Sequence, residues 1–160
     1  MRSRDKGGPM YKVRLLAVRH SRFFEGLYNF VNPGILVTLR GIDRVFGKRL
    51  DRPITAAEAG LKGLLFDCQM CGDCALSKTG MSCPMNCPKT IRNGPCGGVR
   101  ANGMCEVKPE MRCVWVAAWD GASRMKGGEA IKNTEFAVDH RNKGQSTWLK
   151  LAREGRKQGA

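Results

Sequence analysis

The sequence predicts a small α-rich and irregular domain in which a cysteine-rich loop core folds around metal between helical N- and C-terminal extensions. Eight cysteines occur among 160 residues, and six of them lie between Cys68 and Gly98. The chain also contains 20 glycines and 7 prolines, which favour turns over regular structure. Apolar residues at helical spacing occur on both sides of the cysteines. We therefore expect a basic helical extension (1–60), a cysteine-rich metal-binding domain (61–119) and a polar tail with a short helix (120–160).

Two apolar segments of the N-terminal extension are expected to be helical. The first is expected to end at Pro33-Gly34, because proline disrupts a helix interior, and the second spans residues 35–46. Either both are core helices with solvated basic faces, or they form an arm that binds a partner or a membrane surface. The apolar positions of the first segment recur at steps of three and four, at Val13, Leu16, Phe23, Phe24, Leu27, Tyr28 and Val31.

Two further helices are predicted from capping patterns. Thr55 and Glu58 fit a capping box, which would begin a helix that leads directly to Cys68. Ser146 or Thr147 would cap a last helix in the polar tail. The tail is expected to be either a docking element or partly disordered.

The formal net charge of +14 favours an acidic partner, a nucleic acid or a membrane surface as a binding partner. Charged residues interrupt the longest apolar run, so no transmembrane helix is predicted. The N-terminus lacks the pattern of a secretory signal. These features predict a cytoplasmic protein, in which clustered cysteines are more often metal ligands than disulfides.

The spacing of the cysteines favours iron-sulfur clusters over zinc. Two residues between cysteines allow one turn to direct two sulfurs at a single centre, and a third cysteine at the same step exceeds the usual zinc pattern. A [4Fe–4S] cubane offers a separate iron to each thiolate, so such a loop can serve three corners. Eight thiolates suffice for one or two clusters, and zinc is the alternative metal. The candidate ligands are Cys68, Cys71, Cys74, Cys83, Cys87, Cys96, Cys105 and Cys113.

The spacing leaves the division of the cysteines between centres open. If the first three share one cluster, each of the other five is a candidate for its fourth corner. A fully ligated oxidised cluster carries a net charge of about −2, which nearby basic residues would offset. The candidates for this compensation are Lys78, Lys89, Arg92, Arg100 and Arg112.

Four short motifs identify a family resemblance. The stretches CQMCGDC, CPMNCPK, RNGPCGG and CEVKPEMRCVW, which lie in this order from about Asp67 to Trp119, resemble the methylenetetrahydrofolate reductase C-terminal domain family. That family includes the small cysteine-rich subunit of two-subunit reductases. The resemblance implies a hetero-oligomer in which a separate flavin-containing catalytic subunit holds the FMN and the folate site. This chain would then pass electrons to that flavin or brace the catalytic subunit.

The sequence contains no catalytic constellation of its own. It lacks a Gly-x-Gly-x-x-Gly or Walker-type loop, and His20 and His140 are isolated. The first hypothesis is therefore an accessory electron-transfer subunit with iron-sulfur clusters. The alternatives are a structural zinc-binding subunit of the same complex, or a zinc-bearing module that binds nucleic acid through basic residues. The basic residues concerned are Arg40, Arg44, Arg49, Arg52 and the lysines and arginines of the tail.

Overall fold

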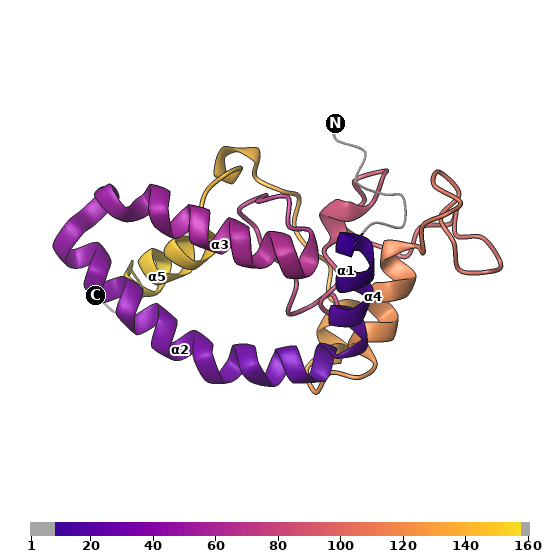
Figure 1. Ribbon diagram of the computed structural model, residues 1–160, viewed down its shortest axis with the longest axis horizontal. Helices are drawn as coiled ribbons and strands as arrows, with labels where there is room; N and C mark the ends of the chain where they lie inside the picture. The colour runs from indigo at the N-terminus through magenta and orange to yellow at the C-terminus, as the bar shows by residue number, and fades with distance from the viewer. Residues whose placement is uncertain (1–8, 158–160) are drawn as a thin grey trace.

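The computed structural model describes residues 9–157 and consists of helices joined by irregular segments (Figure 1). Within these residues the structure has no strand, and its only bridges are Val99–Cys105 and Met104–Arg112. The small helical architecture predicted from the sequence is therefore confirmed. The α-helices are α1 (Pro9–Arg19), α2 (Ser21–Phe46), α3 (Asp51–Phe66), α4 (Val114–Ala122) and α5 (Thr147–Lys157). Short 3₁₀ turns occupy Gly47–Leu50, Pro84–Asn86, Gly128–Lys132 and His140–Asn142.

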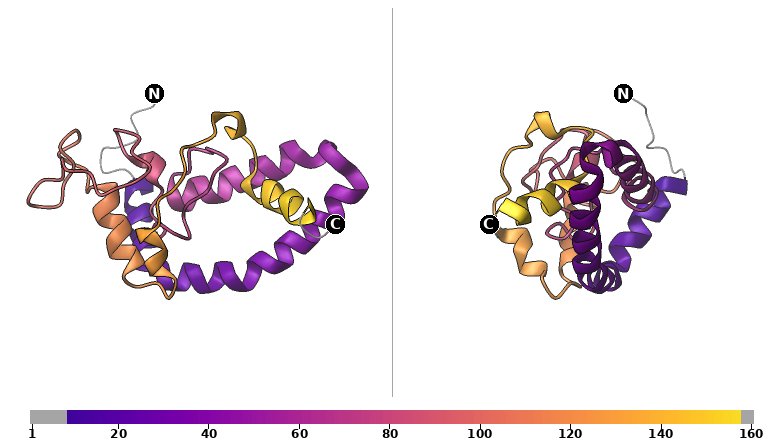
Figure 2. Two further views of the ribbon diagram at one scale, coloured as in Figure 1. Left: turned by 180° about the vertical axis from the view of Figure 1, so that it is seen from behind. Right: turned by 90° about the vertical axis from the view of Figure 1, so that its left-hand side faces the viewer.

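The longest helices, α2 and α3, form a hairpin that organises the molecule. In Figures 1 and 2, α5 lies against the closed end of this hairpin, whereas α1 and α4 lie side by side at its open end. A cluster of apolar side chains joins α2, α3 and α5 at the closed end, including Leu39, Ile54 and Leu149. The cysteine-rich loops therefore emerge at the open end, between α3 and α4.

Helix α2 runs through Pro33, so the predicted end at Pro33-Gly34 is wrong. Proline has no backbone N–H group, so Pro33 removes one hydrogen bond from the helix. Contacts in both halves of α2 stabilise the helix despite this loss. Near its start, the Glu25 carboxylate accepts hydrogen bonds from the Lys126 and Gly127 N–H groups, both at 2.7 Å. In its second half, Leu39 is buried against α5. Tertiary packing thus overrides the local preference of proline.

The chain instead breaks at His20, between α1 and α2, within the segment expected to form a single helix. The Ser21 hydroxyl, which is fully buried, donates a hydrogen bond to the Gly121 carbonyl oxygen at 2.7 Å. This contact attaches the start of α2 to α4. Helix α1 is thereby free to pack across both α3 and α4.

One of the two predicted capping patterns forms. Helix α3 begins at Asp51 and not at the Thr55 capping box, and Glu58 lies fully buried inside the helix. Glu58 accepts hydrogen bonds from the Ser146 hydroxyl and the Trp148 N–H group. Its carboxylate therefore stabilises the start of α5 and does not cap α3. The Ser146 hydroxyl accepts the Leu149 N–H at 3.2 Å and caps α5 as predicted.

The tail docks onto the rest of the protein through α5, and the segment between α4 and α5 consists of 3₁₀ turns and irregular structure. No helix among residues 9–157 combines the length and the apolar character needed to cross a bilayer. Residues 1–8 of the predicted basic extension, and the last three residues of the tail, lie outside the described part of the chain.

Candidate metal centre

Helix α3 delivers Cys68 to the start of the cysteine-rich loop. The helix ends at Phe66, and the next residue, Asp67, caps it by donating its N–H to the Gly63 carbonyl at 3.0 Å. The left-handed backbone of Asp67 (φ 51°) then turns the chain sharply. Met70 also adopts a left-handed conformation (φ 47°), and its N–H group points at the Cys68 sulfur at 3.4 Å. The tight turn after α3 therefore curls the backbone around the first cysteine sulfur.

Four of the eight cysteines, Cys68, Cys71, Cys74 and Cys83, line one small cavity. Burial raises the pKa of the Cys83 thiol, and negative charge on the other three raises it further. The pKa of Cys68 is likewise raised, first by burial and then by Cys74 and Cys71. The four cysteine side chains therefore surround one common space. The structure thus brings Cys83 to the Cys-x2-Cys-x2-Cys loop, which the spacing alone left open among five candidates.

A buried lysine on α3 faces the same cavity. Lys62 is 8% exposed, and its ammonium group lies 2.5 Å from a Glu58 carboxylate oxygen and 5.0 Å from the centre of the Trp148 ring. Burial alone would lower the pKa of Lys62, but negative charge on Cys74 and on Glu58 raises it above its ordinary value. Lys62 therefore remains a cation beside the sulfurs.

A second buried cation approaches the cavity from α1. Arg14 is only 4% exposed and lies over the ring of Tyr11, with 5.2 Å between the guanidinium carbon and the ring centre. Burial lowers its pKa, and negative charge on Tyr11, Asp67 and Cys83 opposes this effect. A buried guanidinium stays charged because its pKa begins so high. Two helices thus bring positive charge to this region: Lys62 lines the cavity, and Arg14 interacts electrostatically with Cys83.

Neither buried cation is among the basic residues that the sequence suggested for charge compensation. Of those, Arg92 lines the cavity, and Lys89 lies near a different cysteine, with 3.7 Å between its ammonium nitrogen and the Cys96 sulfur. Lys78 and Arg112 instead form ion pairs with Glu135 and Asp120. The one signal for Lys62 in the sequence is its position four residues after Glu58, which is typical of a helical ion pair.

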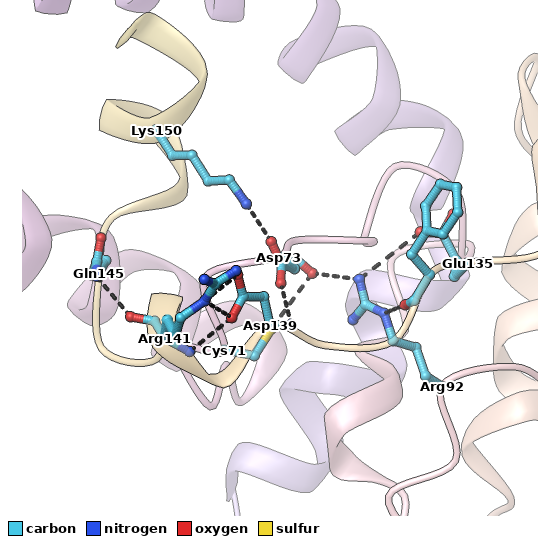
Figure 3. A network of polar contacts seen from close by, with 9 residues as sticks. Cys71, Asp73, Arg92, Glu135, Asp139, Arg141, Gln145 and Lys150 are labelled. Carbon is cyan, nitrogen blue, oxygen red and sulfur yellow. Dashed lines mark hydrogen bonds and ion pairs between the residues drawn. The ribbon is translucent and has the colours of Figure 1, made fainter. Parts of the chain in front are cut away.

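The segment 133–146 closes over the cysteine loop through Asp73 (Figure 3). The Asp73 carboxylate lies 2.5 Å from the Lys150 ammonium group on α5 and accepts the Asp139 N–H at 3.0 Å. Burial would raise the pKa of Asp73, but these two partners hold it below its ordinary value. Arg92 completes the attachment by donating to the carbonyl oxygens of Asp73 and Phe136, each at 2.9 Å. Polar contacts from three parts of the chain therefore fix the loop between Cys71 and Cys74.

A close backbone approach accompanies this network. The Gly144 N–H donates to the Met70 carbonyl at 2.8 Å. Gly72 has φ 81° and lies so near Asn142 that any side chain at this position would collide with the Asn142 carbonyl. Glycine is therefore required here, both because φ is positive and because there is no room for a Cβ. The segment from residue 133 to 146, together with α5, forms one wall of the site.

The remaining four cysteines occupy the adjoining region between the first loop and α4. Cys87 and Cys105 are buried in one apolar cluster with Met111 and Val114, and Cys113 is buried at the start of α4. The Cys113 N–H donates to the Gly103 carbonyl at 3.0 Å, which holds the loop around Cys105 against α4.

Cys96 is more exposed than its neighbours in this second group. Its sulfur accepts the Gly98 N–H at 3.4 Å. Lys89, which lies close to the Cys96 sulfur, also pairs with Glu106, next to Cys105 in the chain. Lys89 thus links the two loops that carry Cys96 and Cys105.

All eight cysteines are free of disulfide bonds. Among residues 9–157, no three side chains of cysteine, histidine, aspartate or glutamate converge on a position where they could share one metal ion. The donor set nevertheless fits a thiolate-bound inorganic centre, since four cysteines line one cavity together with the buried cation Lys62. Cys68, Cys71, Cys74 and Cys83 are the residues that could hold such a centre.

We predict that the ion pair between Lys150 and Asp73 holds the segment 133–146 on the cysteine loop. Lys150→Met should reduce the hydrogen-exchange protection of the Gly144 amide about tenfold, because a hydrogen bond to a partly buried charge contributes roughly 1.5 kcal/mol. Arg141→Met is the matched control, since Arg141 is exposed and its side chain pairs, among residues 9–157, only with neighbouring Asp139. Equal protection in Lys150→Met and the unaltered protein, or an equal loss in both variants, would contradict the prediction.

Comparison with known proteins identifies the family of this chain. A family model described as the methylene-tetrahydrofolate reductase C-terminal region matches residues 48–141, which include all eight cysteines. This match extends beyond the motifs between Asp67 and Trp119 and covers more than half of the chain. No curated protein and no solved structure matches the chain. The protein therefore belongs to the methylenetetrahydrofolate reductase C-terminal family.

Proposed function

We propose that this protein is the accessory electron-transfer subunit of a methylenetetrahydrofolate reductase. It would carry one or two [4Fe–4S] clusters and relay electrons to the FMN of a separate catalytic subunit, which reduces methylene- to methyl-tetrahydrofolate. Membership in the family associates the chain with this reductase. The observation that carries the proposal is the single cavity lined by Cys68, Cys71, Cys74 and Cys83, with Lys62 beside it.

The first three cysteines favour a cluster over a zinc ion. They are separated by two residues each and lie on one loop, so each sulfur can face its own corner of a cubane. Tetrahedral zinc sites instead draw pairs of ligands from separate segments. Cys83 supplies the fourth donor from the next segment of the chain, and Pro84 follows it, as in the Cys-Pro element of bacterial ferredoxins.

The charges around the cavity suit an anionic centre. A centre held by four thiolates carries about −2 whether it is an oxidised cubane or a zinc ion, and burial of that charge is costly without compensation. Lys62 and Arg14 supply two buried positive charges, held in place by Glu58 and by the ring of Tyr11. This compensation would stabilise the thiolate forms of Cys68 and Cys83, whose pKa values are raised first by burial and then by the neighbouring cysteines.

A bound cubane would supply one-electron transfer, and the surrounding residues would set its reduction potential. The Met70 N–H donates toward the Cys68 sulfur, which disperses negative charge on that ligand. The Lys62 ammonium favours the more negative, reduced state through its charge. Both effects raise the potential. The loop network around Asp73 fixes the positions of Cys71 and Cys74, which limits reorganisation during electron transfer.

The second group of cysteines provides donors for a second centre. Cys87 and Cys105 are buried in one apolar cluster, and Cys113 is buried at the start of α4. Cys96 lies on the loop that Lys89 joins to Glu106. Two centres in adjoining loops would form a short relay through the protein. The flavin and the folate site would belong to the catalytic subunit, because this chain carries no motif for either.

Metal and sulfide analysis of anaerobically purified cysteine variants tests the proposal. Cys71→Ser, Cys83→Ser and the double variant should lose the same amount of iron and sulfide, because one missing ligand opens the same centre. Adding Cys105→Ser to Cys71→Ser should remove the iron that remains. Normal iron in Cys83→Ser would contradict the assignment of the four ligands. A colourless protein that holds zinc without sulfide would reject electron transfer in favour of a structural zinc subunit.

We predict that Lys62 raises the reduction potential of the first centre. Lys62→Met should lower the midpoint potential in an EPR-monitored titration, because removal of a nearby positive charge disfavours the reduced state. Lys62→Arg should restore most of the difference, whereas Lys48→Met, on the exposed turn after α2, should have no effect. An unchanged potential in Lys62→Met at full iron content would contradict this role.

A further inference from the structure

Helix α2 exposes an apolar stripe along most of its length. Phe23, Phe30, Val37 and Val45 are 64%, 86%, 66% and 74% exposed. At about 100° per residue, these four side chains lie within about 40° of a single line along the helix. Soluble monomers rarely leave an apolar surface of this extent uncovered, and such a surface marks a site of interaction.

The stripe borders an apolar groove between α2, α3 and α5. The groove has a volume of about 850 Å³, and it receives Leu27 and Val31 from α2, Leu61 from α3 and Leu151 from α5. All four side chains are more than a third exposed. Leu27 and Val31 lie between the groove and the stripe on the surface of α2, so the two apolar regions are continuous.

The groove reaches the candidate metal centre. Cys74 lines both the groove and the cavity of the first four cysteines, and it is the most exposed of these four. Phe136, which is 91% exposed, projects from the segment 133–146 at the same groove. A molecule seated in the groove would therefore contact the loop that carries the exposed ligand.

The charges around this surface favour an acidic partner. Lys150 and Lys78, which line the groove, are already paired with Asp73 and Glu135. On the opposite side of the stripe, Arg22 and Arg44 are exposed, and neither forms an ion pair within residues 9–157. The surface thus combines an apolar centre with an exposed positive edge. A complementary partner would present apolar side chains flanked on one side by carboxylates.

The shape of the surface favours a protein over a membrane. A bilayer presents a broad surface to an amphipathic helix, and the residues that enter it must project outward. Here a large part of the apolar surface lines a recess between three helices. A protruding segment of a folded protein can fill such a recess, and burial of its apolar side chains would drive the association.

We propose that the groove and the α2 stripe form the docking surface for the catalytic subunit. An apolar segment of that subunit would enter the groove over Cys74, and its flanking carboxylates would face Arg22 and Arg44. This inference rests on the proposed function, since it assigns the position at which that partner binds. It also places the partner against Cys74, which belongs to the cysteine loop.

Binding measurements with the purified catalytic subunit test this surface. Phe30→Glu and Val37→Glu in the full chain should each weaken the affinity at least tenfold, because each places a charge in the centre of an apolar contact. Val107→Glu is the matched control: Val107 is 51% exposed on the loop between Cys105 and Cys113 and lies outside the groove. Unchanged iron content and circular dichroism establish that the variants remain folded.

The outcomes separate this inference from the proposed function. Tight binding by the unaltered chain with unchanged affinity of both glutamate variants would overturn the docking surface and leave the function standing. No binding by the unaltered chain would overturn both. A self-associated chain that Phe30→Glu converts to a monomer, without effect on the catalytic subunit, would assign the surface to a second copy. If the unaltered chain binds phosphatidylserine vesicles and Phe30→Glu abolishes this binding without affecting the binding of the catalytic subunit, the surface would be assigned to a membrane.

Discussion

The placement of four cysteines around one cavity is the constraint on which the rest of the structure depends. Thiolates placed together away from water repel one another, so the fold must supply positive charge and hydrogen-bond donors around them. Lys62 provides that charge from α3 and Arg14 from α1, whereas the Met70 N–H contacts one sulfur directly. Elements remote in sequence are therefore assembled around one short loop, and a bound centre would in turn stabilise their packing.

The same elements connect the site to the surface. Helix α3 positions Cys68 and Lys62, and it also forms one side of the apolar groove. Helix α5 supplies Lys150 to Asp73 and closes the hairpin of α2 and α3. Because Cys74 belongs to both the cavity and the groove, a partner bound there would lie against the ligand loop. Holding a metal centre and presenting it to a partner are thus compatible tasks of a single small fold.

The sequence predicted the helical class, the family and the cap at Ser146, because each depends on local patterns or on distinctive motifs. Prediction failed at Pro33 and at Thr55. Helix α2 continues through Pro33 because Glu25 binds the Lys126 and Gly127 N–H groups and Leu39 packs on α5. Helix α3 begins before Thr55, and its Glu58 binds the start of α5. Residue spacing could not select Cys83 as the partner of the first three cysteines, since that choice depends on how the chain folds back. The roles of Lys62 and Arg14 were also missed, because burial of a single charged residue leaves no periodic signal.

Anomalous diffraction at the iron absorption edge, from crystals grown without oxygen, tests the central assignment most directly. A strong iron peak is expected in the cavity bounded by Cys68, Cys71, Cys74 and Cys83, with each sulfur at a separate corner. A cavity without iron, or a peak that appears only at the zinc edge, would contradict the assignment of an electron-carrying centre to these four residues.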